Sequence, residues 1–271
     1  MKVWFHYSMH DLPGYALFCG WCTAGKWPCP VCRHRLKFLW LDAGRKYFAF
    51  DKNRPFHKIG HRFREDKKNF MKGVVVHEEK VIPTFEGAAI DAELRALELN
   101  TLSSEVPGPQ FEGYGETHNW THVVGLTKLE YYKDLDLPHN IDVMHTEKNV
   151  TESLFHTILN IPGKSKDNVK ARVDVEKLCD RKKQHMQPPD RNRKNWFKPH
   201  ADFCLDSLEK KEALKWLKYI VMFPDGYCSN MSKGVNLGTG KVTGLKSHDY
   251  HIWIERLMPV MVRGYLPEHV R

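Results

Sequence analysis

Apolar residues recur along this chain at two spacings, which together predict a mixed α/β fold that is mostly helical. Alternation of apolar residues with other types predicts a strand over residues 2–9. Two short apolar runs predict further strands at residues 38–41 and 74–76. The strand segments are few and short, so most of the core is expected to come from helices.

Four helices are predicted from apolar residues that return every three or four positions. Two cover residues 87–100 and 146–161, and the others begin after the expected capping residues Asp206 and Ser247. Glu209 follows Asp206 by three residues, which is the spacing of a capping box, and Pro259 is expected to kink the last helix. The residues expected on the buried faces are Ile90, Leu94, Leu97, Val150, Leu154, Ile158, Leu208, Leu214, Leu217, Val221, Tyr250, Ile254, Leu257, Met258 and Met261.

Proline, glycine and charge mark the connecting segments. Residues 101–117 are rich in Pro and Gly, so they are predicted to be a loop or linker between residues 1–100 and residues 118–271. Residues 181–198 are strongly basic and contain two consecutive prolines, which predicts a mobile loop.

Composition narrows the class of protein. With 271 residues, 41% of them hydrophobic, the chain is long enough to bury a real core. No apolar run approaches the roughly 20 residues of a membrane span, and the first residues lack the apolar centre of a signal peptide. Seven cysteines without a secretory signal fit a reducing compartment, with thiols or zinc rather than disulfides. The net charge of +9 favours DNA or another polyanion as partner, or an acidic protein; a merely solvated basic surface is the alternative.

Asp11 and the cysteines that follow it carry the first candidate chemistry. Asp11 comes just after the predicted strand, where a carboxylate could be presented to a metal or a substrate. Cys29 and Cys32 have the spacing with which two thiolates grip one Zn²⁺, so they form a candidate zinc half-site. The pair Cys19 and Cys22 is separated from them by only six residues, and is equally well explained as small buried side chains.

Two further groups could bind metal or DNA. Asp142 and His145 are three residues apart, so they could share a metal or form a buried hydrogen-bonded pair. The basic segment offers side chains for DNA phosphates, or a nuclear-import patch, or a solvated loop. The candidate DNA-binding residues are Arg181, Lys182, Lys183, Arg191, Arg193 and Lys194.

Longer motifs follow one another in a characteristic order over nearly the whole chain, and they lie at residues 11–15, 20–21, 29–32, 118–120, 139–150, 163–168, 223–227, 244–249 and 259–267. In these motifs and in their order the chain resembles plant CACTA-type (En/Spm-like) transposases. The resemblance to these transposases is weakest in residues 73–117 and 180–205. The chain also distantly resembles the antigen-receptor recombinase at Cys29–Cys32 and at the Ile-Asp-x-x-His element around Asp142.

The resemblance implies a fragment of an RNase H-like DDE transposase core with a helical zinc-binding insertion. In such enzymes three acids, Asp, Asp and Glu, hold two Mg²⁺ ions for phosphoryl transfer on transposon DNA in the nucleus. Asp11 matches the second acid, and Cys29 and Cys32 match a zinc pair in the insertion. The other two acids and the remaining zinc ligands, two histidines, match no residue between Met1 and Arg271.

We therefore expect no cleavage by this chain alone, and no second acidic side chain close enough to Asp11 to share a metal. Asp142 is the main candidate to contradict that expectation. A full-length transposase is a possible partner that could supply the missing acids. The alternatives are a zinc- and nucleic-acid-binding module without catalysis, or a transposon remnant without a function. The chain departs from the family where it lacks a Cys-His dipeptide near Lys52–Asn53 and where it carries Cys19 and Cys22.

Overall fold

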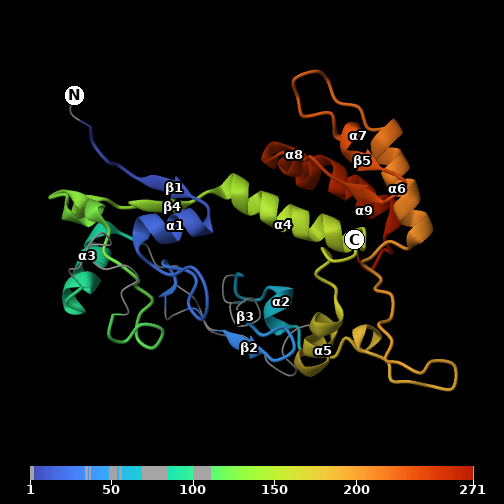
Figure 1. The fold of residues 1–271 in the computed structure, drawn as a ribbon, viewed down its shortest axis with the longest axis horizontal. Helices are drawn as coiled ribbons and strands as arrows, with labels where there is room; N and C mark the ends of the chain where they lie inside the picture. The colour runs from blue at the N-terminus through green and yellow to red at the C-terminus, as the bar shows by residue number, and fades with distance from the viewer. Residues whose placement is uncertain are drawn as a thin grey trace. The chain divides into compact units, whose positions relative to one another are not determined.

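The computed structural model describes residues 3–33, 36, 38–48, 54, 57–68, 85–99 and 111–270. They form a mixed α/β structure with more helix than strand, as the sequence predicts. The chain divides into two compact units, Met1–Asp142 and Val143–Arg271 (Figure 1). The boundary between these units follows Asp142, and residues 101–110 of the predicted linker lie outside the described residues. The predicted strand at 74–76 also lies outside them.

A short parallel sheet organises the first unit. Strand β1 (Ser8–His10) pairs with β4 (His139–Ile141), and helix α1 (Leu12–Cys19) follows β1 directly (Figure 1). Only the end of the strand predicted over residues 2–9 is formed. Upstream of Ser8 the chain leaves β4, because the Phe5 N–H donates to the Tyr131 hydroxyl instead. Pro138, which precedes β4, has no N–H with which to continue the pairing.

Helix α1 was not predicted, because its start reads as a turn. The Asp11 carboxylate caps the helix by accepting the Gly14 N–H at 2.9 Å, and Pro13 lies in the first turn, where it is tolerated. Gly20, at φ +80°, ends the helix in the left-handed conformation. The cap holds Asp11 at the junction of strand and helix.

The core of the first unit is aromatic, and helix α3 (Gly87–Ala96) packs into it through Ile90 and Leu94, as predicted. Trp21 and Trp120 meet edge to face at 5.3 Å, which joins residues 118–142 to the N-terminal segment. The unit's other elements are β2 (Leu39–Leu41), β3 (Lys46–Phe48), α2 (Arg62–Glu65) and the 3₁₀ turns η3 (Gly125–Lys128) and η4 (Tyr132–Asp134).

The second unit is built on three helical segments. Helix α4 (Val143–Ile158) begins and ends three residues earlier than predicted; it buries Phe155 and Ile158 but leaves Val150 and Leu154 exposed. Helix α6 (Ser207–Tyr219) has the predicted capping box. The third segment consists of α8 (Ser247–Ile252), the π-helical η6 (Trp253–Leu257) and α9 (Met258–Tyr265). The π-helical turn precedes Pro259, which cannot donate the α-helical backbone hydrogen bond.

Two details of these helices correct the sequence predictions. Leu208 is exposed, because the buried stripe of α6 runs through Ala213, Leu214 and Leu217. The N-cap of α8 is Lys246 and not Ser247, since the Asp249 carboxylate accepts the Lys246 N–H at 2.7 Å.

The remaining elements of the second unit are short. They are α5 (Val169–Leu178), η5 (Lys182–Gln184), α7 (Met231–Gly234), β5 (Val235–Asn236) and β6 (Lys241–Val242). None of the helices in the described part of the chain has the length and apolar character needed to cross a lipid bilayer.

Candidate nucleic-acid interface

The basic segment predicted as a mobile loop contains regular backbone pairing. Gln187 and Phe197 exchange two backbone hydrogen bonds, each 2.9 Å long, and Asp190 pairs with Arg193 across a tight turn. We call residues 187–198 the basic hairpin. Pro188 and Pro189 have no N–H to donate, so the pairing is interrupted between these two bridges.

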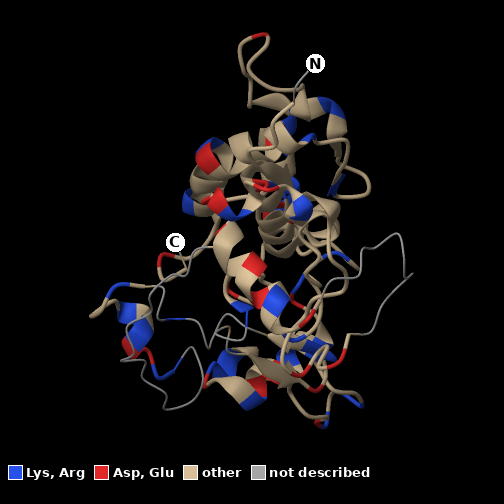
Figure 2. Cartoon of the chain, turned by 90° about the vertical axis from the view of Figure 1, so that its left-hand side faces the viewer, with Lys and Arg blue, Asp and Glu red and all other residues tan. Residues whose placement is uncertain are grey.

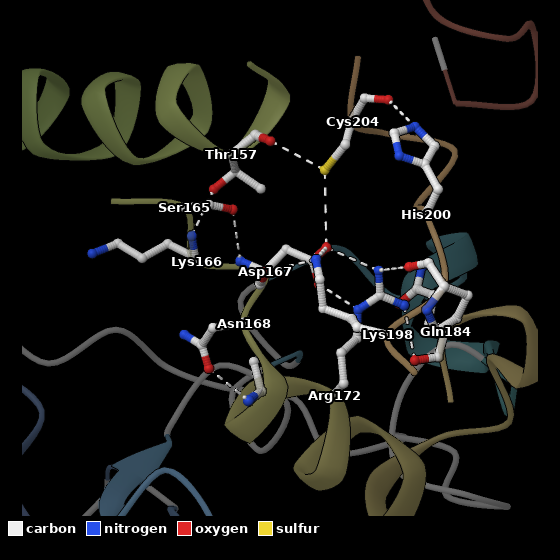
Figure 3. A network of polar contacts seen from close by, with 12 residues as sticks. Thr157, Ser165, Lys166, Asp167, Asn168, Arg172, Gln184, Lys198, His200 and Cys204 are labelled. Carbon is white, nitrogen blue, oxygen red and sulfur yellow. Dashed lines mark hydrogen bonds and ion pairs between the residues drawn. The ribbon is translucent and has the colours of Figure 1, made fainter. Parts of the chain in front are cut away.

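The base of the basic hairpin is fixed by one buried carboxylate, that of Asp167 (Figure 3). It accepts hydrogen bonds from the Arg172 guanidinium, one of them at 2.9 Å, and from Lys198 Nζ at 2.8 Å. Arg172 also donates to the carbonyls of Gln184 at 2.8 Å and Pro199 at 3.4 Å. Both ends of the segment are therefore tied to α5, which carries Arg172.

The ionisation of Asp167 follows from these contacts. Burial alone would raise the pKa of its carboxyl group, but the hydrogen bonds and charges of Arg172 and Lys198 hold the pKa below its usual value. The thiol of Cys204 points at the same carboxylate, with 3.9 Å between Sγ and Oδ2 (Figure 3). Burial, followed by the charge of Asp167, raises the pKa of Cys204 to about 11, so this cysteine stays a neutral thiol.

The six predicted DNA-binding residues fall into two groups. Arg193 pairs with Asp190, Lys183 with Asp202 at 3.5 Å, and Arg181 is half-buried. Lys182, Arg191 and Lys194 are exposed, and in the described part of the chain none of these three has an ion-pair partner. These three cations are the ones available to a ligand.

Positive charge is unevenly shared between the two units. The second unit carries 23 Lys and Arg against 15 Asp and Glu, whereas the first carries 19 against 18. Both signs of charge are interspersed along the helices (Figure 2). Almost all of the net charge of +9 therefore belongs to the unit that contains the basic hairpin.

Each strand of the parallel sheet is followed directly by an aspartate, Asp11 after β1 and Asp142 after β4. Residues His10 and Ile141 are in register, and the Asp142 N–H donates to the His10 carbonyl at 2.8 Å. Asp11 and Asp142 thus leave the same end of two adjacent parallel strands, which lie about 4.8 Å apart. Among the described residues, however, no three His, Cys, Asp or Glu side chains are grouped so as to hold a metal ion.

His145 lies one turn into α4, in the second unit, whereas Asp142 closes the first unit. The metal role predicted for this pair stays a prediction.

The four N-terminal cysteines have different surroundings. Cys29 and Cys32 share one turn, in which the Cys32 N–H donates to Cys29 Sγ at 3.3 Å. Cys19 is buried, and burial raises the pKa of its thiol to about 12, while Cys22 is only half-buried. Cys19 is therefore a structural side chain, as expected. No two of the seven cysteines are joined by a disulfide. His34, the nearby histidine that could complete a zinc site, lies outside the described residues.

Sequence reasoning missed the residues that shape the interface. Asp167 lies in the motif at residues 163–168, but a single acidic residue among lysines does not indicate that its side chain is buried. The partners that bury it, Arg172 and Lys198, lie five and 31 residues away. Trp196 and Phe197, both exposed on the basic hairpin, were also missed. A tryptophan in a polar, basic run was the available signal.

Comparisons of this chain with family models, with curated proteins and with solved structures found no match.

Proposed function

We propose that this chain is a transposase-derived DNA-binding protein whose second unit holds the phosphate backbone. The observation that carries the proposal is the Asp167 network, which fixes a hairpin and leaves Lys182, Arg191 and Lys194 without ion-pair partners among the described residues. A buried carboxylate that holds two cations costs desolvation energy. Here it anchors a segment whose remaining cations face solvent, as a phosphate-binding surface requires.

The family resemblance supports the same proposal from the first unit. An RNase H-like core presents acids at strand ends, and Asp11 and Asp142 leave the same ends of β1 and β4. We assign Asp11 to the second catalytic acid of the resembling enzymes, where it would hold Mg²⁺ together with acids that match no residue of this chain. The same proposal includes a nuclear location and a full-length transposase as partner.

A zinc role is the second candidate. It rests on the single turn that holds Cys29 and Cys32, with an N–H to sulfur hydrogen bond inside it. Two thiolates would supply half of a tetrahedral site, and a structural zinc there would stabilise the fold without taking part in chemistry.

Salt-dependent binding to duplex DNA tests the main proposal. Each phosphate contact releases counterions, so the logarithm of affinity should fall linearly with the logarithm of salt concentration. Changing Lys182, Arg191 and Lys194 together to alanine should weaken binding and flatten that slope by about three, roughly one for each lost contact.

The matched control removes three exposed lysines from the first unit, with Lys58, Lys128 and Lys133 all changed to alanine. This variant has the same net charge as the variant that lacks Lys182, Arg191 and Lys194, and it should keep the wild-type slope. Equal losses in both variants would mean that net charge alone drives binding. Absence of salt-dependent binding in the wild-type chain would overturn the proposal.

A further inference from the structure

The basic hairpin exposes an aromatic side chain that the described structure does not use. Trp196 is 62% exposed, and no ring contact or hydrogen bond involves its side chain in the described part of the molecule. The other exposed tryptophans differ: Trp4 packs on Tyr131 at 5.1 Å and Trp40 on Tyr47 at 5.0 Å between ring centroids. Trp196 is thus a large apolar ring left in solvent.

The backbone around Trp196 is held in place although the ring is exposed. Its neighbour Phe197 exchanges two backbone hydrogen bonds with Gln187, and Lys198 is tied to Asp167. The ring is therefore carried on an anchored strand, which lowers the conformational entropy that a ligand would have to overcome.

The hairpin that carries Trp196 also carries several cations. Arg193 lies over the Phe197 ring, with 4.6 Å between the guanidinium carbon and the ring centroid. Lys194 and Arg191 are exposed on the adjoining turn. An exposed aromatic flanked by cations is complementary to a ligand that has both flat faces and negative charges, as a nucleotide strand does.

We propose that the basic hairpin binds unpaired nucleotides, with Trp196 stacked on a base and Arg191 and Lys194 on the adjacent phosphates. This inference rests on the proposed DNA binding and narrows its substrate to single-stranded or locally opened DNA. In a duplex each base face is already covered by its neighbours, so the ring gains little there. In a single strand the faces are available, and stacking on them tolerates any sequence.

Fluorescence anisotropy with two labelled ligands tests the inference. One is a thymidine oligonucleotide of about 12 nucleotides, a length within the usual range for single-strand sites, and the other is a duplex of equal length. Trp196→Ala should weaken binding of the single strand about tenfold and binding of the duplex less than about twofold. Trp196→Tyr should restore most of the single-strand affinity, because it keeps an aromatic face.

Trp40→Ala is the matched control, since it removes another exposed tryptophan from the first unit, and it should change neither affinity. Thermal unfolding of each variant confirms that the fold is kept. Equal effects of Trp196→Ala on both ligands, or no effect on either, would overturn the stacking role but would not contradict the proposed DNA binding of the wild-type chain. A wild-type chain that binds neither ligand would overturn the proposed function itself. If Trp196→Ala changes the affinity for neither DNA ligand, the exposed ring is assigned instead to contact with another protein.

Discussion

The two units of this chain differ in the material of their cores and in the charge they display. The first unit packs tryptophan, tyrosine and phenylalanine rings around buried polar groups such as His139 and Asn119. The second packs mostly leucine, isoleucine, valine and methionine, and its buried polar groups include the ion pair of Asp167 and Arg172.

The two units hold their polar residues in place by different interactions. In the first unit neutral hydrogen bonds inside an aromatic core hold the strands that end in Asp11 and Asp142, and the unit is nearly neutral. In the second unit one buried charge holds a segment that displays opposite charges. The free energy of unfolding of the first unit should therefore depend on pH through the protonation of a buried histidine. That of the second unit should fall when a single buried carboxylate is removed.

The largest expected effect is on the second unit. Asp167→Asn leaves the guanidinium of Arg172 buried without its counter-charge, which should lower the free energy of unfolding of this unit by about 3–5 kcal/mol. Urea denaturation followed by hydrogen exchange in α5 and α6 measures the loss. Exchange in α1 and α3, in the first unit, should change little.

Asp190→Asn is the matched control for that prediction. Asp190 also pairs with an arginine, Arg193, but both side chains are substantially exposed. Water and salt screen such a pair, so its loss should leave the stability unchanged within error. Equal destabilisation by the two variants would show that the Asp167 network is no more than a surface ion pair.

Local patterns predicted the helices α3, α4, α6 and the last helical segment but not α1 or α5. Long-range contacts decide several features that local patterns do not show. The capping box at Asp206 and Glu209 and the buried face of α3 are set by residues close in sequence, so they were readable. The exposure of Val150 and Leu154 depends on which side of α4 meets the rest of the second unit. The spacing of apolar residues within α4 does not indicate which side of the helix is packed.

The candidate sites were likewise predictable only where their residues lie close together in the sequence. The cysteine turn and the basic segment were visible as sequence patterns, but the pairing of the strands that precede Asp11 and Asp142 was not. These two residues are 131 positions apart in the chain, and they follow adjacent strands only because β1 and β4 pair in parallel. The Asp167 network likewise joins α5 to Lys198 across 31 residues.

An intermediate effect is expected from pH on the first unit. His139 is 2% exposed, with its ring between the hydroxyls of Ser8 and Tyr132, and burial followed by the charge of His10 lowers its pKa to about 4. The unfolded chain, with a pKa near 6.5, binds the proton more readily than the folded chain. Stability is therefore complete above about pH 6.5 and is lost as the pH falls toward 4, with about 2 kcal/mol gone at pH 5.

Urea denaturation at pH 7 and pH 5, followed by hydrogen exchange in α1, measures this loss. His139→Gln should be less stable at pH 7 but should lose less on acidification. An unchanged pH dependence in that variant would assign the effect to other groups.

A smaller effect is expected from zinc. Two thiolates provide only part of the stabilisation of a closed tetrahedral site. Zinc should therefore bind weakly and should be removed by dialysis against a chelator. Metal analysis of the purified protein should show less zinc after Cys29 and Cys32 are both changed to serine. The control changes Cys22 and Cys228, which are half-buried as Cys29 is, to serine. Tightly bound zinc that survives loss of Cys29 and Cys32 would defeat the assignment.

The smallest expected effect is on DNA cleavage, where we expect none. Two-metal phosphoryl transfer needs ions about 3.5–4 Å apart, held by several carboxylates. The pairing of β1 with β4 sets Asp11 and Asp142 at the same end of two adjacent strands, and among the described residues no three His, Cys, Asp or Glu side chains are grouped so as to hold a metal ion. Asp11 is moreover engaged as the cap of α1, where it accepts the Gly14 N–H.

A supercoiled plasmid incubated with Mg²⁺ or Mn²⁺ reports any nicking, and the wild-type chain should behave as Asp11→Asn and Asp142→Asn do. Metal-dependent nicking that both variants abolish would show that these two acids, with a third group supplied by a second copy or by residues outside the described ranges, assemble an active centre. Nicking that neither variant affects would point to a contaminating nuclease. The two substitutions together therefore decide whether the acidic end of the first unit is a catalytic site or only the end of a strand pair.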